Sequence, residues 1–485
     1  MRQFITYYGV VLLMKIKDDL SPGGEWMNKA NLRKVAFWTM VFLAIIWALA
    51  SLLDRQDVQP IRNAYIMNGD GLASFPMWGY SLLIRLLGSV TAVVALQSVL
   101  GAFATAALMV RLNCLAPGLK RITTALFLSS LPWLSFMAYA YQMPISSTFV
   151  ILALLALEMA IRSGRITWGI VAGILCGVGQ NFRSELLLLP GTVLIAVFIL
   201  SKMQWFRCAS IKPLAVGAGV ALMLQIPWAL NCHFNAGRFS LSESNLGHVV
   251  FIGLAKLPSN PWNIEPSDGF AQETVDKAGL NCSSLSFQGG NFLKHKFVEA
   301  VRQCPPAYVK CLGMRIWGTV YYPFVFVPFA ATPAEERAVR ELVRLIKPWG
   351  YPNIAVTPEP TGHSASLIKV AGMLLYAIAQ GILIRAASIL GIFGFFLAMR
   401  KAPFQLNQPI VLCLGIALAY RIGMNLVICD SGKYMTGVYL CYLPFAANSM
   451  SAIFHFFQQR WHRSKSAQRV TADTLPPVSA DRGSQ

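Results

Sequence analysis

Charged residues are scarce in this chain: only 13% of its 485 residues are Asp, Glu, Lys or Arg, whereas 55% are hydrophobic. A soluble domain carries about 25% charged residues, so this composition excludes an ordinary water-soluble fold. Acidic residues are the scarcest, 21 against 41 basic ones, which gives a formal net charge of +20. The basic residues lie mainly in short connections between apolar runs, where they orient helices in a bilayer. This placement argues against nucleic-acid binding.

Metal-binding cysteine patterns are absent as well. The ten cysteines are scattered, with no Cys-x-x-Cys pair and no clustering with histidine, which argues against a structural zinc site. Cys232, Cys282, Cys304 and Cys311 share one long polar segment. In an oxidising compartment they would allow three disulfide connectivities, among which the sequence does not choose, and free buried cysteines fit equally well.

The first 26 residues are not expected to act as a signal peptide, because the apolar stretch 5–14 is too short to span a bilayer and no small-residue cleavage site follows it. Met27 precedes a basic stretch and is an alternative translation start. We therefore assign residues 1–34 to a cytoplasmic N-terminal segment.

Apolar runs long enough to cross a bilayer predict an all-α polytopic membrane protein with about ten transmembrane helices. The runs are 35–53, 89–110, 121–139, 146–162, 167–182, 185–201, 212–230, 381–399, 409–428 and 436–456. Every second connection is basic, as is the tail 457–485, and these are expected in the cytoplasm. The first loop 54–88 and the long segment 231–380 are then expected outside. The transmembrane modules are thus 35–230 and 381–456.

The segment 231–380 is expected to fold as an outward-facing, α-rich loop domain, with helices at 291–315 and 334–347. Residues 366–380 predict a helix lying on the membrane, and so does the stretch that begins near Gly79. Polar residues from about 464 onward predict disorder.

The first outer loop carries three carboxylates, Asp54, Asp57 and Asp70, in a stretch with four aromatic residues. The aromatic residues are Tyr65, Phe75, Trp78 and Tyr80. A carboxylate at the membrane surface can take a proton from an acceptor hydroxyl or hold a divalent cation against a phosphate. Alternatively, Asp54 and Asp57 solvate a helix end and Asp70 belongs to an Asn-Gly-Asp-Gly turn.

Arg183 and Glu185 join two apolar runs without a polar loop around them, which places both at the membrane surface. Arg183 is suited to grip a lipid-linked phosphate, or it pairs with Glu185 for structural reasons alone. Arg385 and Arg421 interrupt apolar runs elsewhere, and the sequence assigns them no role.

Two later groups complete the candidate site residues. Lys433 and Tyr434 lie in the last outer loop, where they either contact a second phosphate oxygen or anchor a helix at the interface. Asn245 and His248 begin the long segment, in a mixture of hydroxyl, amide and aromatic side chains that suits sugar recognition and equally an ordered loop.

Taken in order, these features resemble the integral membrane glycosyltransferases of the C superfamily (GT-C), especially aminoarabinose transferases and protein O-mannosyltransferases. The likeness spans residues 35–456. It rests on the acidic first loop, a Pro-Met-Trp-Gly-Tyr turn at 76–80, and Arg183-Ser184-Glu185 after a glycine-rich helix. Asn245-Leu246-Gly247-His248 and Lys433-Tyr434 resemble later motifs of the family.

The resemblance implies transfer of a sugar from a polyprenyl-phosphate donor to a glycan, lipid or protein acceptor in cell-envelope biosynthesis, with inversion at the anomeric carbon. The site would face the periplasmic side of a bacterial inner membrane. Asp57 would act as the base, with Asp54 and Asp70 as alternatives, and Arg183, Lys433 and Tyr434 would bind the donor phosphate. Tyr65, Trp78, Tyr80, Glu185, Asn245 and His248 would contact substrate. No cofactor is implied with certainty, and a divalent metal is left open.

Two other classes compete with this interpretation. A polysaccharide polymerase or ligase of another fold would also have many helices and a large outer loop, but it would not need the acidic first loop. A transporter would carry broken helices in matching halves, and we find no such inverted repeat in the sequence.

Overall fold

The chain folds as a helical membrane protein. The computed structural model describes residues 28–51, 79–139, 142–183, 186–206, 208–241, 246–256, 260–265, 267–321, 324–331, 333–346, 353–358, 367–399, 402–427 and 437–473. Six of its helices are long and apolar enough to span a bilayer, and three shorter apolar helices lie among them. The polytopic helical character is therefore confirmed, whereas about ten crossings and the outward loop domain stay predictions.

Several predicted spans are single helices with bounds close to those expected. They are α2 (Lys29–Ser51), α5 (Val90–Leu115), α8 (Gln142–Ser163), α9 (Ile166–Gln180), α10 (Leu189–Lys202) and α19 (Pro409–Val427). The side chain of Ser89 caps α5 by accepting a hydrogen bond from the Ala92 N–H at 3.0 Å. α9 and α10 are only 15 and 14 residues long, shorter than the roughly 20 residues that span a hydrocarbon core.

Two predicted spans are broken by proline. The run 121–139 forms α6 (Lys120–Leu128) and α7 (Leu131–Ala138), with Pro132 at the start of α7. The short 3-10 turn η3 (Pro117–Leu119) comes directly before α6. The run 212–230 forms α11 (Lys212–Met223) and α12 (Ile226–Ala236), which together supply one of the six candidate spans, Lys212–Phe234. A proline lacks the N–H of a continuing helix and is accommodated in a first turn, so each run restarts there.

Glycines allow α9 and α11 to pack with their backbones in contact. A β-carbon at Gly173 would lie 2.4 Å from the carbonyl oxygen of Gly217, and one at Gly169 would lie 2.0 Å from that of Pro213. Small residues at this spacing drive helix association in membranes, where close backbone approach replaces the hydrophobic effect.

Part of the long segment has a core of its own. α13 (Leu246–Gly253), the 3-10 turn η4 (Leu254–Lys256), α14 (Asp268–Lys277), α15 (Phe287–Gln303) and α16 (Pro305–Tyr321) form this helical part. Phe251, Leu254, Val275 and Leu293 are buried together in it. The helical stretch predicted at 291–315 is thus two helices, which meet at Cys304.

The same segment contains a short parallel sheet that the sequence analysis did not anticipate. β1 (Phe324–Ala331) pairs with β2 (Asn353–Pro358), with Phe324 opposite Asn353. α17 (Pro333–Ile346) connects the two strands, as parallel strands require a crossover, and it fits the helix predicted at 334–347. The helical fold class stands, with this two-stranded sheet as an addition that fits the β-branched and aromatic residues of β1.

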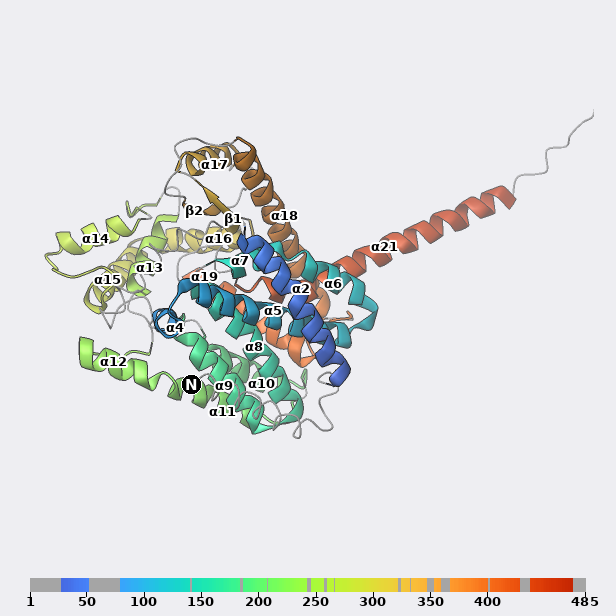
Figure 1. Ribbon diagram of the computed structural model, residues 1–485, viewed down its shortest axis with the longest axis horizontal. Coiled ribbons are helices and arrows are strands. Elements are labelled where there is room, and N and C mark those ends of the chain that lie inside the picture. Colours follow the sequence, from blue (N-terminus) through green and yellow to red (C-terminus); the bar gives the residue numbers. More distant parts are fainter. Residues whose placement is uncertain are drawn as a thin grey trace, which may run out of the picture.

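Two further boundaries differ from those predicted. α18 (Leu367–Ala398) is one continuous helix of 32 residues, so the predicted membrane-surface helix at 366–380 and the span that begins at 381 are not separate elements. α21 (Tyr439–Asp473) continues past residue 464, where disorder was predicted. Its C-terminal part projects away from the helical bundle (Figure 1).

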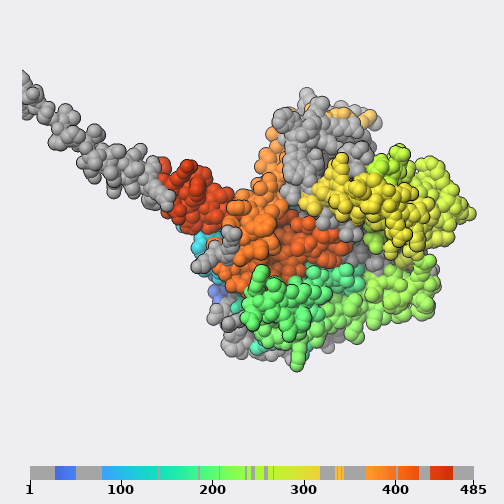
Figure 2. All heavy atoms as spheres, turned by 180° about the vertical axis from the view of Figure 1, so that it is seen from behind, coloured from blue at the N-terminus to red at the C-terminus, as the bar shows by residue number. Residues whose placement is uncertain are grey.

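The helices surround one large core. α18 packs along the first part of α21, α9 packs between α8 and α11, and α2 lies against α5 and α7. On the face seen in Figure 2, the green α11 and α12 lie below the orange α18 and α19, and the yellow α15 and α16 lie to the right. Exposed side chains on this bundle are often large and apolar, including Phe198 and Phe396, as expected for helices that face lipid.

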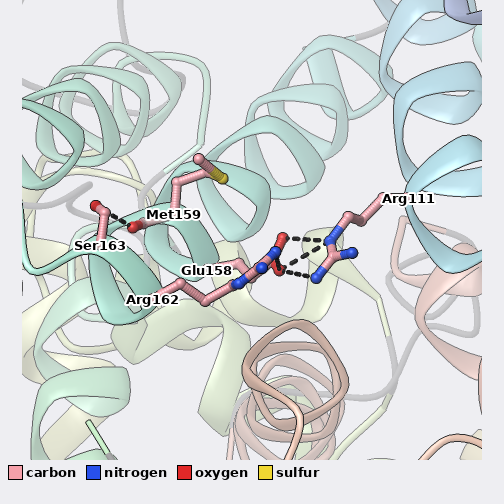
Figure 3. A network of polar contacts seen from close by, with 5 residues as sticks. All are labelled: Arg111, Glu158, Met159, Arg162 and Ser163. Atoms are coloured by element: carbon pink, nitrogen blue, oxygen red, sulfur yellow. Dashed lines mark hydrogen bonds and ion pairs between the residues drawn. The ribbon is translucent and has the colours of Figure 1, made fainter. Parts of the chain in front are cut away.

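An ion cluster is buried within the bundle (Figure 3). Arg111 of α5 donates to the carboxylate of Glu158 on α8 from Nε at 2.8 and 3.0 Å. Arg162, one turn further along α8, lies 3.5 Å from the same carboxylate. Glu158 is fully buried and Arg111 is only 5% exposed. This cluster joins the C-terminal ends of α5 and α8.

Candidate functional site

The candidate site lies where the short helix α4 (Gly79–Leu87) meets the C-terminal end of α9. The N–H of Gly79 donates to the carbonyl of Asn181 at 2.9 Å. A β-carbon at Gly79 would lie 2.5 Å from that oxygen, so only glycine allows this approach. The short helix that the sequence predicts near Gly79 is present as α4. Its position at the end of α9 could not be read from the sequence.

Tyr80 anchors α4 in an apolar cluster. Its side chain is fully buried beside Ile84, Val93 and Phe182, and the ring of Phe182 stacks on Phe149 of α8 with centroids 5.8 Å apart. Burial raises the pKa of the Tyr80 hydroxyl above its ordinary value, so this group stays protonated at neutral pH. Contact of Tyr80 with substrate remains a prediction, because no part of its side chain is exposed here.

Gln180 holds the turn between α9 and α10. Its side-chain oxygen accepts the N–H of Leu187 at 2.8 Å, and its side-chain nitrogen lies 3.5 Å from the carbonyl of Leu241. Gln225, in the break between α11 and α12, donates to the carbonyl of Gly177 at 2.7 Å. The end of α9 thus collects segments that are distant in sequence, and we refer to Gly79, Gln180, Asn181, Leu187 and Leu241 as the α9-end junction.

Arg183 follows this junction directly. Its backbone N–H donates to the carbonyl of Gly179 at 3.3 Å, and the residue is only 9% exposed. Because the neighbouring Phe182 packs against Tyr80, the predicted phosphate-binding residue and the end of the first loop lie next to one another.

Arg421 of α19 is a further candidate that sequence reasoning set aside. It is 8% exposed and lines a cavity of about 20 Å³ with Leu186, Leu189 and Val438. A cavity of this size holds one water molecule, so the described residues by themselves do not form a sugar-sized pocket at this point. The available signal was a lone charge in an apolar run, which marks a functional position in a membrane helix by default.

His248 lies in the helical part of the long segment, away from solvent. His248 is 3% exposed, and its Nε2 lies 2.9 Å from Oδ1 of Asp268. The Asp268 side chain lies at the start of α14 and is 86% exposed. Its Nδ1 is buried without a hydrogen-bond partner. A ligand reaching Nε2 would have to displace Asp268, so sugar binding by His248 is not supported directly by this geometry and stays a prediction.

The remaining predicted site residues lie outside the described part of the chain. They are Asp54, Asp57, Asp70, Tyr65, Trp78, Glu185, Asn245, Lys433 and Tyr434. Described residues nevertheless lie close to them in the chain: Gly79 follows Trp78 directly, Leu241 precedes Asn245 by four residues, and Val438 follows Tyr434 by four. These described residues lie at the α9-end junction or at the small cavity beside it.

Metal and disulfide chemistry receive no support from the described residues. Among them, no group of three or more His, Cys, Asp or Glu side chains is placed to hold a metal ion, and the three candidate carboxylates of the first loop are not included in that search. Cys232, Cys282, Cys304 and Cys311 are all free thiols.

Comparison with protein-family models, with curated proteins and with solved structures finds no match for this chain. Its function must therefore be argued from its own residues.

Proposed function

We propose that the protein is an inverting glycosyltransferase that moves a sugar from a polyprenyl-phosphate donor to a glycan, lipid or protein acceptor, at the periplasmic face of a bacterial inner membrane. The observation that carries the proposal is the α9-end junction. It unites the end of the acidic first loop, the Arg183 turn and the start of the long segment at one end of a membrane-embedded helical bundle.

The chemistry follows from what such a donor requires. Its lipid tail must stay in the bilayer while its phosphate lies near the surface, which is the level of Arg183 in the predicted topology. The acceptor oxygen attacks the anomeric carbon, the bond from that carbon to the phosphate oxygen breaks, and the acceptor proton passes to a carboxylate. Cations such as Arg183 and Lys433 stabilise the departing phosphate.

One base suffices for this reaction, because a phosphate leaves without needing a proton. A glycoside hydrolase instead generally uses a pair of carboxyl groups. Asp57 is the preferred base, since it is the nearest acid upstream of the segment that leads to Tyr65. Asp54 and Asp70 are the alternatives.

The proposal is tested by single-turnover transfer in proteoliposomes, with a radiolabelled polyprenyl-phosphate sugar and a mixed glycolipid acceptor fraction. Asp57→Asn should lower the transfer rate about 10²–10⁴-fold, which is the usual worth of a general base, while donor binding and thermal stability stay normal. Asp54→Asn and Asp70→Asn are the matched controls.

A collapse at position 54 or 70 instead would move the base to that residue. Normal rates in all three variants would remove the base from this loop. If the wild-type protein releases no sugar from any polyprenyl-phosphate donor, yet moves labelled solute across the vesicle membrane, the transferase proposal is wrong and transport replaces it.

A further inference from the structure

A second, larger pocket opens at the opposite end of the bundle from the α9-end junction. Its volume is about 490 Å³, within the range of small-molecule sites. α10 starts beside the junction and ends at Lys202. Leu200 near the end of α10 lines the pocket, as do Trp205 and Phe206, which follow α10 in the chain. The end of α18, residues 405–407 of the connection that follows it, and α19 supply the other walls.

The lining of this pocket is almost entirely apolar. Eleven of its thirteen residues are hydrophobic or glycine, and the exceptions are the amides Gln405 and Asn407. The rim is open to the surface, since Trp205 is 63% and Met399 55% exposed. An open apolar pocket between membrane helices faces lipid chains, because they are the molecules that surround it.

Exposed lysines lie at the ends of two helices near the pocket. Lys202, in the last turn of α10, is exposed, and its Nζ lies 5.8 Å from the ring centroid of Phe198. Lys212 at the start of α11 is exposed as well. The three wall-forming stretches 189–206, 367–399 and 402–427 contain no Asp or Glu, so nothing in them repels an anion.

We propose that this pocket binds one anionic phospholipid of the adjoining leaflet, with an acyl chain among Leu200, Phe395 and Ile416 and its phosphate toward Lys202. The amides of Gln405 and Asn407 supply hydrogen-bond donors for the ester or phosphate oxygens. The site shares no residue with the proposed transferase site and does not depend on it.

Native mass spectrometry of the purified protein in detergent tests this site, with phosphatidylglycerol and phosphatidylcholine added at equal concentration. The wild-type protein should retain one phosphatidylglycerol in preference to phosphatidylcholine. Ala419→Phe fills the pocket from its exposed side and should lose that adduct. Lys202→Gln should keep lipid binding but reduce the preference for phosphatidylglycerol.

Ala386→Phe is the matched control, because Ala386 is exposed on α18 and does not line the pocket; it should retain the adduct. Equal retention by Ala419→Phe and wild type would overturn the site, and equal retention of the two lipids by wild type would overturn the anionic assignment. Lipid-free dimers would assign the surface to a second copy of the chain.

A measurement on the unmodified protein keeps the test independent of how the variants fold. Phosphatidylglycerol with a photoactivatable acyl chain should crosslink to peptides within 195–206 or 395–419. Crosslinks confined to other helices would contradict the proposal.

Discussion

Glu158 shows how a single residue bears on stability in this bundle. Its fully buried carboxylate is the acceptor for Arg111 and lies 3.5 Å from Arg162. Glu158→Gln removes the carboxylate that pairs with the buried Arg111 cation, and breaking a buried ion pair costs about 3–5 kcal/mol. We expect a large fall in the melting temperature in detergent.

The control for this prediction is Glu299→Gln in an exposed pair with Lys296 at 2.9 Å, where surface pairing contributes little. The double variant Arg111→Met with Glu158→Leu should recover much of the lost stability, since it replaces both charges of the buried pair by apolar side chains. A melting temperature unchanged by Glu158→Gln would mean that Arg111 is stabilised by other groups.

Arg183 is the described residue that most directly tests donor binding. Loss of a charged hydrogen bond to the donor phosphate is worth about 1.5–3 kcal/mol, so Arg183→Ala should weaken donor affinity by roughly 10- to 150-fold. Arg165→Ala is the matched control, because Arg165 precedes the opposite end of the same helix, α9. Normal donor affinity combined with a lowered melting temperature would make Arg183 a structural residue only.

At the scale of elements, the contact between α9 and α11 depends on the absence of side chains. Gly173→Ala places a methyl group 2.4 Å from the Gly217 carbonyl, and such overpacking typically costs 1–3 kcal/mol. Gly219→Ala on α11 meets nothing within 4 Å and should gain up to about 1 kcal/mol of helix propensity. We expect the two melting temperatures to shift in opposite directions; a common direction would show that helix packing does not set the effect.

At the scale of the whole molecule, the predicted orientation can be measured with native cysteines. Cys114, at the end of α5, is exposed, and Cys282 in the long segment is partly exposed. In single-cysteine variants, an impermeant maleimide should label Cys282 in intact spheroplasts and Cys114 only after permeabilisation. Asp70→Cys should behave like Cys282. The reverse pattern would invert the whole topology and place the proposed site in the cytoplasm.

Local patterns in the sequence determined much of the molecule. Low charge and long apolar runs specify a helical membrane protein, because the bilayer leaves its backbone few alternatives. Proline positions 132 and 227 mark helix starts, although the run lengths suggested uninterrupted spans. The start of α4 at Gly79 follows from a turn and an amphipathic stretch. Each of these depends on neighbours within a few residues along the chain.

Other features required the tertiary structure. β1 and β2 pair with one another although α17 separates them in the chain. α18 continues through residues 380 and 381, where the sequence analysis placed a boundary between two helices. Nothing in the sequence places Asn181 against Gly79, or Leu241 against Gln180. Candidate residue types follow from chemistry, which is local, whereas their meeting at the end of α9 follows from close packing among distant helices.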